Sequence, residues 1–569
     1  MSMRYRFFLA ALLWLPLATA GDVPTRHITY REYFDKAQGG WLGKISGVTL
    51  GVPREFAETW PPSNIRYFGE VPDHFSDLYS GDDLYFPLLI QICLKKYGTH
   101  PTYEQYMREW SDQLFRGKVW GANSIALEHY WAGIMPPKTG FPGYNGGHDD
   151  DAQIDFDSAG WVAPGLMNQA SEMADYGGHI MCWGDGADGA VMVAAMLSEA
   201  FFTSDVEQLV RRAQSVLPRK SAYRAMVEDV LRWHREQPDW RVTRQLLARK
   251  YSSESTIEES SAVVNGGAVL IGLLYGDKDF GKTVVTAMHC GWDSDCNPAT
   301  AGGILGTMLG ASKIDPRWSL IFHDTYENYC LRGLPRWLRI SEIARDTVEI
   351  GQKVVLENGG HVSGTGEERV FTIPVEEPRT LVRQELYSDE LIEHNRREMQ
   401  DYYREKLKLV TRDWQPEWQL TMASFQNPPE VLADYFGRHR VLRAQPGADA
   451  VTLQRTVTLA AGKHHYLRVG VAHHPTILNE QTGSPEIGKW ILEVQVNGNK
   501  VGEFTVYTQG GQVVWEDPQF DLTPYAGQTV RLSLVGREKV SDTEFYMVSE
   551  STYWSDVEII SLGQPEPWR

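Results

Sequence analysis

The chain has 569 residues, 42% of them hydrophobic, and carries 55 Lys and Arg residues against 74 Asp and Glu residues, a formal net charge of −19. A chain of this length can form two or three domains with a large core. Nucleic acids and anionic membranes both require a cationic surface, so this charge argues against either partner.

The first twenty residues have the pattern of a secretory signal peptide. Arg4 and Arg6 precede an apolar segment from Phe7 to Leu17, and Ala18-Thr19-Ala20 forms a small-residue cleavage site. The apolar segment is too short to span a bilayer, and no later stretch is long and apolar enough. We therefore expect residues 1–20 to be removed, and the mature protein to be secreted or periplasmic and free of the membrane.

Residues 29–350 are expected to form an all-α domain. Apolar residues recur there at three- and four-residue spacing, which is typical of helices that pack on one face. Clusters of Gly and Pro separate the periodic segments. The expected helices cover residues 30–47, 84–97, 103–115, 187–202, 206–215, 223–237 and 284–290.

Residues 351–412 are expected to link this domain to a second one. Asn358-Gly359-Gly360 and Gly364-Thr365-Gly366 interrupt the first part of the linker. The segment from Glu385 to Val410 is rich in Glu, Arg and Lys and predicts an exposed helix.

Residues 413–569 show a hydrophobic period of two, which predicts β-strands. Asn497-Gly498 follows one alternating segment and is a strong hairpin signal. Strands at this spacing predict an all-β sandwich. The alternating segments are 451–459, 467–471, 490–496, 530–534 and 555–559.

Two pairs of aspartates precede helical segments that lie far apart in the chain. Asp293 and Asp295 stand in a turn before the small-residue segment from Ala299 to Gly310, and Asp82-Asp83 opens an apolar segment. Either pair alone is equally explained as a helix cap, because Asp is a favoured N-cap residue. Together, two such helix starts can form a cage of carboxylates for a hard cation, Mg²⁺ or Ca²⁺.

The five cysteines are too few and too scattered for a disulfide scaffold, and none forms a C-x-x-C motif. In an oxidising compartment a bridge between Cys290 and Cys296 can brace the turn that carries Asp293 and Asp295. Buried free thiols are the alternative. The five residues are Cys93, Cys182, Cys290, Cys296 and Cys330.

With a third segment, from Gly39 to Glu55, these motifs resemble those of the ADP-ribosylglycohydrolase family, in the same order, over residues 29–345. The resemblance implies an orthogonal helical bundle with its active site in a cleft formed by loops and helix starts. It also implies one or two Mg²⁺ ions, with Ca²⁺ or Mn²⁺ as alternatives, held between paired aspartates. In the family these ions hold ribose hydroxyls while an acidic residue and metal-bound water break the bond at the anomeric carbon.

Carried over by position, the resemblance assigns catalytic roles to Glu55 and Asp83. It also marks departures from the family pattern. Gly81 and Cys296 replace threonines that usually supply metal oxygens, and Val48 replaces a usual acidic residue. Cysteine is a soft ligand poorly matched to Mg²⁺, so we expect one metal site to be weakened, remade with water or lost. The predicted metal ligands are Asp82, Asp83, Asp293 and Asp295.

A larger departure lies in the loop that holds phosphates in ADP-ribose-cleaving members. The corresponding residues 149–157 contain five aspartates in nine positions. Phosphate is bound by backbone amides and positive charge, so this run disfavours a pyrophosphate ligand. A solvated or Ca²⁺-binding loop is an alternative interpretation of the run.

Carboxylates interleaved with aromatic residues suit the hydroxyls and ring faces of sugars. The segment from Gly178 to Gly186 resembles the substrate loop of the family. A core position is the ordinary alternative for most of the tryptophans. The predicted substrate-binding residues are Asp155, Asp157, Trp183, Asp185 and Trp292.

We therefore expect an exported, metal-dependent glycoside hydrolase that cleaves a glycosidic bond of an extracellular glycan, with a furanoside as one candidate. One alternative is a hydrolase that releases ADP-ribose from protein or nucleotide. Another is a non-catalytic sugar-binding protein that kept the fold and lost the second metal. The run from Phe520 to Val530 resembles jelly-roll modules of secreted carbohydrate-active enzymes, and a purely structural sandwich is the alternative for that domain.

Overall fold

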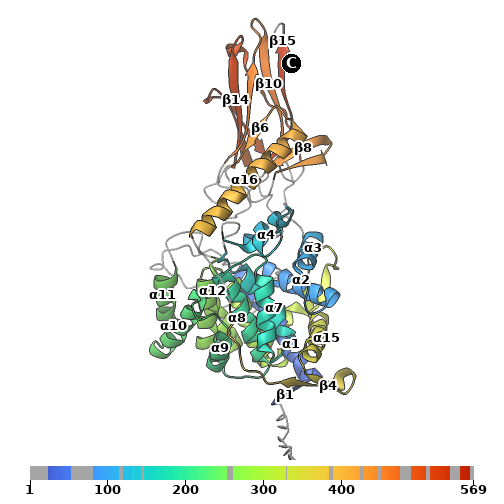
Figure 1. The fold of residues 1–569 in the computed structure, drawn as a ribbon, viewed down its shortest axis with the longest axis vertical. Helices are drawn as coiled ribbons and strands as arrows, with labels where there is room; N and C mark the ends of the chain where they lie inside the picture. Colours follow the sequence, from blue (N-terminus) through green and yellow to red (C-terminus); the bar gives the residue numbers. More distant parts are fainter. Residues whose placement is uncertain are drawn as a thin grey trace, which may run out of the picture.

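A helical part and a β part lie one above the other along the long axis of the molecule, with a long helix between them (Figure 1). This confirms the predicted fold class of an all-α bundle followed by an all-β sandwich. The predicted signal peptide and Glu55 lie outside the described residues. The computed structural model describes residues 24–52, 81–114, 119–131, 133–142, 147–252, 260–328, 330–382, 389–422, 429–444, 450–473, 489–507, 513–538 and 552–563.

The helical part is built around helices that are buried on nearly all sides, α8, α12 and α14. Such helices are apolar all round, and for this reason α12 has no helical period that the sequence could reveal. Within the described ranges, no helix combines the length and hydropathy that a bilayer span requires. The helices are α1 (Tyr30–Gly51), α2 (Asp82–Tyr97), α3 (Tyr103–Gln113), α4 (Gly121–Trp131), α5 (Asp151–Asp155), α6 (Asp157–Trp161), α7 (Met167–Gly178), α8 (Asp185–Ala200), α9 (Val206–Gln214), α10 (Ala222–Glu236), α11 (Trp240–Tyr251), α12 (Ala262–Tyr275), α13 (Phe280–His289), α14 (Cys296–Leu309) and α15 (Ile340–Glu357).

Helices α1 and α14 pack backbone to backbone because glycines line their contact. The glycines of α1 recur every four residues and so share one face of the helix. A Cβ atom built on Gly43 would lie 2.0 Å from the carbonyl oxygen of Gly302, and one on Gly51 would lie 2.1 Å from that of Ser294. Any larger residue would force the helices apart. The end of α1 is thereby held against the start of α14, where Asp295 lies.

Two small antiparallel sheets complete the helical part. One has the strand order β1–β5–β4, with Ile28 opposite Phe371, and joins the start of the described chain to the segment after α15. The other pairs β2 with β3. The strands are β1 (Thr25–Thr29), β2 (Thr325–Glu327), β3 (Trp337–Arg339), β4 (His361–Ser363) and β5 (Val370–Pro374).

The β part consists of two five-stranded sheets, ordered β13–β10–β15–β8–β7 and β12–β11–β14–β9–β6, in which the paired strands run antiparallel. Their apolar faces share one core, in which the ring centroids of Trp490 and Trp554 lie 5.0 Å apart. The predicted hairpin is confirmed, since Asn497 and Gly498 both have positive φ and connect β11 to β12. The strands are β6 (Gln419–Thr421), β7 (Glu430–Tyr435), β8 (Arg438–Ala444), β9 (Val451–Thr458), β10 (His464–Ala472), β11 (Lys489–Val496), β12 (Asn499–Tyr507), β13 (Gln519–Asp521), β14 (Thr529–Glu538) and β15 (Thr552–Leu562).

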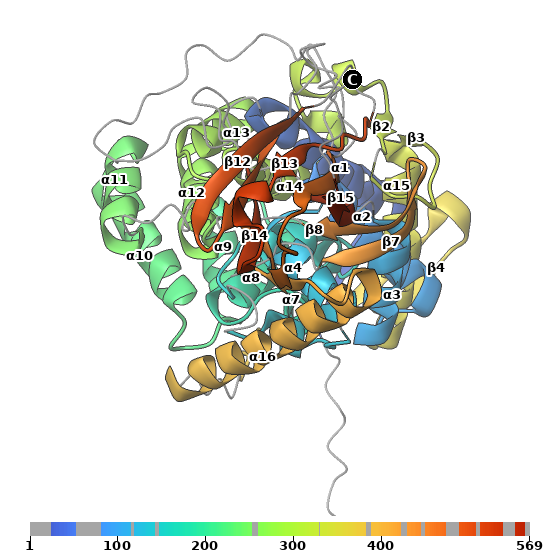
Figure 2. The same ribbon diagram turned by 90° about the horizontal axis from the view of Figure 1, so that it is seen from above.

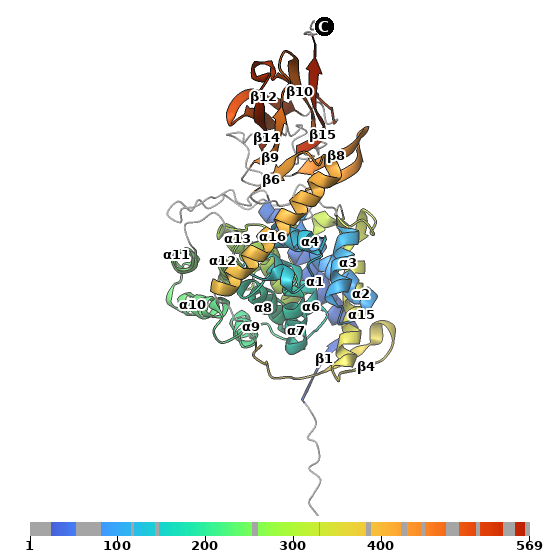
Figure 3. The ribbon, with the colours of Figure 1, turned by 45° about the horizontal axis from the view of Figure 1, so that its top comes forward.

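Helix α16 (Asp389–Trp414) runs from the helical part to the sandwich (Figure 3). Its first half contacts the helical part, where Glu398 pairs with Lys138 at 2.6 Å and Asn395 donates to the carbonyl oxygen of Pro142. Its last turns carry buried residues of the sandwich core, including Trp414. Seen from above, the helix passes along one side of the helical part (Figure 2). The charged segment is therefore a connector whose end belongs to the sandwich.

Candidate metal and active site

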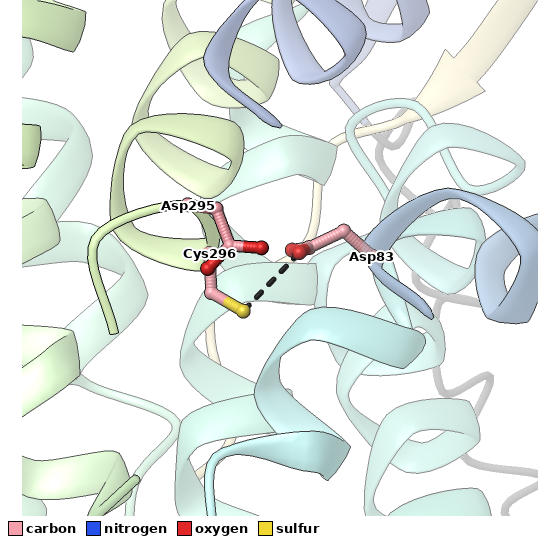
Figure 4. A group of neighbouring side chains, drawn as sticks. All are labelled: Asp83, Asp295 and Cys296. Carbon is pink, nitrogen blue, oxygen red and sulfur yellow. Dashed lines mark hydrogen bonds between the residues drawn. The ribbon is translucent and has the colours of Figure 1, made fainter. Parts of the chain in front are cut away.

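The first turns of α2 and α14 bring acidic side chains from distant parts of the chain to one point. Asp83 from α2 faces Asp295 and Cys296 from α14 (Figure 4). One ligand atom from each residue lies within 4.8 Å of the others, and all three residues are buried. The carboxylates of the front pair and the rear pair thus converge, at a separation that one metal ion can bridge.

The other members of the two pairs lie beside this cluster. Asp82 is half-buried and accepts a hydrogen bond from the backbone N–H of Asp83 at 3.2 Å. Asp293 is buried, and its Oδ1 accepts from the backbone N–H of Cys296 at 3.3 Å. Asn265 of α12 orients the turn, because its Oδ1 accepts from the backbone N–H of Asp293 and from the side chain of Asn297.

Lys44 of α1 is the buried cation of the site, and its role was not predicted from the sequence. Its ammonium group contacts the carboxylate of Asp157, lies 3.6 Å from Oδ1 of Asp83 and donates to the carbonyl oxygen of Ile154 at 3.1 Å. Burial disfavours this ammonium, but the two carboxylates outweigh burial and raise the pKa of Lys44. Lys44 is the single charged residue of the apolar, glycine-rich segment from Gly39 to Gly51, and this was the available sequence signal.

The acidic run contributes further buried carboxylates next to the same point. Asp155 has no exposed surface and lies close enough to Asp82 and Asp83 for their charges to raise its pKa, although burial is the larger cause. Asp151 of this run is likewise affected by Asp82. The run therefore lies against the start of α2.

Burial is also the main reason that the Asp82–Asp83 pair holds its protons unusually tightly. It raises the pKa of each residue to about 7. For Asp82 the charge of Asp83 adds to the effect, whereas for Asp83 the ammonium of Lys44 opposes it and Asp295 adds to it. Such shifts are frequent where a buried site must bind a cation or move a proton.

These residues fit the divalent cation that the resemblance implies. Oδ1 of Asp295 and Oδ1 of Asp83 are buried and have no hydrogen-bond partner among the described residues, and the ammonium of Lys44 lies 3.6 Å from Oδ1 of Asp83. Carboxylate oxygens of this kind are the ligands that hard cations prefer. Cys296 adds a soft donor. The ligands placed to hold a cation are thus Asp83 and Asp295, with Cys296 beside them.

All five cysteines are buried thiols that form no disulfide, so the alternative of a bridge between Cys290 and Cys296 is not realised. The thiol of Cys296 donates instead to Oδ2 of Asp83 at 3.1 Å. Burial raises the pKa of this thiol well above its usual range, and the neighbouring carboxylates raise it further.

The remaining residues predicted to bind substrate lie in different surroundings. Asp157 is engaged by Lys44, and Asp185 accepts from the backbone N–H of Tyr223 at 3.1 Å. Trp183 is half-buried against the rings of Phe141 and His179. Trp292 has 6% of its surface exposed, and the guanidinium of Arg244 lies 3.9 Å from its ring centre. Asp155 is the predicted substrate residue that lies in the carboxylate cluster.

Comparison with known proteins places the helical part in a family. The model of the ADP-ribosylglycohydrolase family matches residues 29–348. A solved structure titled "ADP-ribosylglycohydrolase-related protein complex" shares 18% identity over 56% of this chain and 99% of that chain, with a TM-score of 0.40. The structure of TmCBM61 in complex with β-1,4-galactotriose shares 13% identity over 26% of this chain and 90% of that chain, with a TM-score of 0.18. No curated protein sequence matches the chain. Because the family model covers more than half of its residues, this chain belongs to the ADP-ribosylglycohydrolase family.

Proposed function

We propose that this protein is an exported, Mg²⁺-dependent glycoside hydrolase that cleaves a glycosidic bond in an uncharged extracellular glycan, with a furanoside as the leading candidate. The observation that carries the proposal is the convergence of Asp83 and Asp295 beside a run of buried aspartates. Carboxylates can hold a cation and accept hydrogen bonds from sugar hydroxyls, and they repel the phosphates of ADP-ribose.

The charges around the site favour a neutral substrate over a pyrophosphate. Residues 147–157 contain no Lys or Arg. Lys44 has no exposed surface and is paired with two carboxylates, and Arg244 is buried against Trp292. Neither cation is placed to bind a phosphate group, which needs positive charge or free backbone amides. The acidic run and these two engaged cations therefore favour a neutral substrate over ADP-ribose.

The residues of the chain divide the chemical work between them. Asp83 and Asp295 would hold the divalent cation, which when bound would supply positive charge for sugar hydroxyls and activate water. Lys44 lies 3.6 Å from Oδ1 of Asp83, and its charge favours the ionised form of this carboxylate against the effect of burial. Asp82, half-buried and with a pKa of about 7 in the metal-free protein, is suited to accept or donate a proton near neutral pH.

Glu55 remains our predicted general acid or base, on the strength of its fixed offset of four residues from Gly51 in the sequence pattern.

We also propose that the sandwich binds carbohydrate through an aromatic cluster at β7 and β15. Phe436 is 58% exposed and meets Tyr435 edge-on, as Trp515 does, while Tyr553, stacked on Tyr435 at 4.1 Å, is buried and supports them. Exposed aromatic faces suit the apolar side of a sugar ring. Phe436→Ala should weaken retention on an immobilised glycan without changing turnover of a small substrate, and unchanged retention would contradict this role.

The proposed activity is tested with the full-length mature protein. We expect Mg²⁺-dependent release of sugar from a panel of neutral oligosaccharides and aryl furanosides, and none from ADP-ribosylated protein. Asp295→Asn should abolish release, whereas Asp279→Asn, which keeps an acceptor for the backbone N–H of Lys282 at the start of α13, should retain it. Release of ADP-ribose alone would refute the proposal, and glycan binding without turnover, insensitive to chelation, would favour a sugar-binding protein.

A further inference from the structure

We propose that Asp149, Asp150 and Asp151 form a second cation site, separate from the cluster of Asp83, Asp295 and Cys296, which binds Ca²⁺ or Mg²⁺ through oxygen ligands alone. The inference rests on the metal-binding part of the proposed function and not on the identity of the substrate.

The three side chains meet the geometric requirement for such a site. Each presents one carboxylate oxygen, and the three atoms lie within 4.8 Å of one another. Two oxygens on opposite sides of a Ca²⁺ ion, each about 2.4 Å from it, lie about 4.8 Å apart. One hard cation can therefore contact all three.

The burial of Asp150 is the independent sign that a ligand is required. Its side chain is 1% exposed, and its Oδ2 has no hydrogen-bond partner among the described residues. A buried carboxylate oxygen that accepts no hydrogen bond is costly. Burial raises the pKa of Asp150 well above its usual range, and the charge of Asp149 raises it further. A cation at this point removes both penalties, because it replaces the lost water and offsets the repulsion.

The backbone around the three aspartates is already fixed in place. The N–H of Asp150 donates to the carbonyl oxygen of Ser260 at 2.8 Å, and the N–H of Ala262 donates to that of His148 at 2.9 Å. The thiol of Cys182 donates to the carbonyl oxygen of Asp149. Oδ2 of Asp151 accepts from the backbone N–H of Asn123 at 2.6 Å. A site held from three segments pays little for ordering when it binds an ion.

The Asp82–Asp83 pair adjoins both clusters. Asp83 belongs to the first cluster, and its charge also reaches Asp150. The charge of Asp82 interacts with Asp149 and Asp151 of the second. A cation in each cluster would offset the charge of the pair. The second site thus offers a place for the ion that Gly81 and Cys296 no longer help to hold.

The test counts ions in the full-length mature protein. Protein stripped with a chelator is dialysed against Ca²⁺ or Mg²⁺, and bound metal per chain is measured by mass spectrometry. We expect two ions in the wild type, one in Asp150→Asn, one in Asp295→Asn and none in the double variant. Asp185→Asn, which removes a nearby charge outside both clusters, should keep two.

The outcomes separate this inference from the proposed function. One ion that Asp295→Asn removes and Asp150→Asn leaves in place would overturn the second site while sparing the first. One ion that Asp150→Asn removes and Asp295→Asn leaves in place would support the second site, and it would contradict the metal site on which the proposed activity depends. If Asp150→Asn does not fold, as judged by circular dichroism, Asp149→Asn at the half-buried position replaces it with the same expected count.

Discussion

The Lys44→Met substitution tests whether a buried cation organises the site. Methionine keeps most of the volume of the side chain and removes the ammonium group. In the folded protein this group contacts Asp157, lies 3.6 Å from Asp83 and donates to Ile154. Removal of one partner from a buried ion pair costs about 3–5 kcal/mol. We therefore expect the free energy of unfolding to fall by about 3 kcal/mol at pH 7, and by less at pH 5, where the two carboxyl groups bind protons more readily.

The assay is urea unfolding of the metal-free mature protein, followed by far-ultraviolet circular dichroism of the helical part. Lys36→Met is the matched control, because Lys36 lies on the same helix and its ammonium donates to the carbonyl oxygens of Ala200 and Met308. Loss of such bonds costs about 1.5–3 kcal/mol at most. Addition of Asp157→Asn should recover part of the loss in Lys44→Met but none in Lys36→Met. If Asp157→Asn recovers none of the loss in Lys44→Met, the reasoning is refuted.

Three further predictions concern the packing, the donor set and the proton balance of the site. Gly302→Ala should destabilise the helical part by about 1–3 kcal/mol, because the new Cβ would lie 2.3 Å from the carbonyl oxygen of Gly43. Gly303→Ala should be tolerated, because the atom nearest to its new Cβ lies 3.6 Å away. Thermal unfolding of the two variants measures the difference in stability. Cys296→Thr should raise the affinity for Mg²⁺ at least several-fold and lower that for Cd²⁺, since an oxygen replaces a soft sulfur, and calorimetric titration that shows no change would argue that Cys296 is not a ligand. Because burial raises the pKa of the Asp82–Asp83 pair from 3.8 to about 7, the folded metal-free protein holds more protons than the unfolded chain between these pH values. The stability of the metal-free protein should therefore fall as the pH rises through this window. Mg²⁺ binding at pH 6 should release protons, which is measured as a binding heat that depends on the ionisation enthalpy of the buffer.

The convergence of Asp83 and Asp295 could be anticipated because local signals and a family pattern agree on them. Each aspartate opens a helix, and the glycines of α1 recur at the spacing that lets two helices touch. The Asn497-Gly498 hairpin was equally accessible, since its turn requires positive φ at both residues.

Other features depend on contacts between distant segments, and sequence spacing does not encode these. Lys44 meets Asp157 only after α1 and α6 have packed, so Asp157 looked like a free carboxylate in the sequence. Cys290 and Cys296 are close in sequence, yet the thiol of Cys296 bonds Asp83 across the site. Asn265 lies in a helix without a polar face, and it meets the Asp293 turn only through tertiary packing.

A crystal structure of the mature protein soaked with Mn²⁺, recorded at a wavelength where manganese scatters anomalously, tests the central claim most directly. Manganese accepts the same carboxylate ligands as magnesium. We predict an anomalous peak for a manganese ion that is coordinated by oxygens of both Asp83 and Asp295. If the crystal is soaked at a saturating Mn²⁺ concentration and no anomalous peak appears there, and the two carboxylates contact only protein atoms, the account is contradicted.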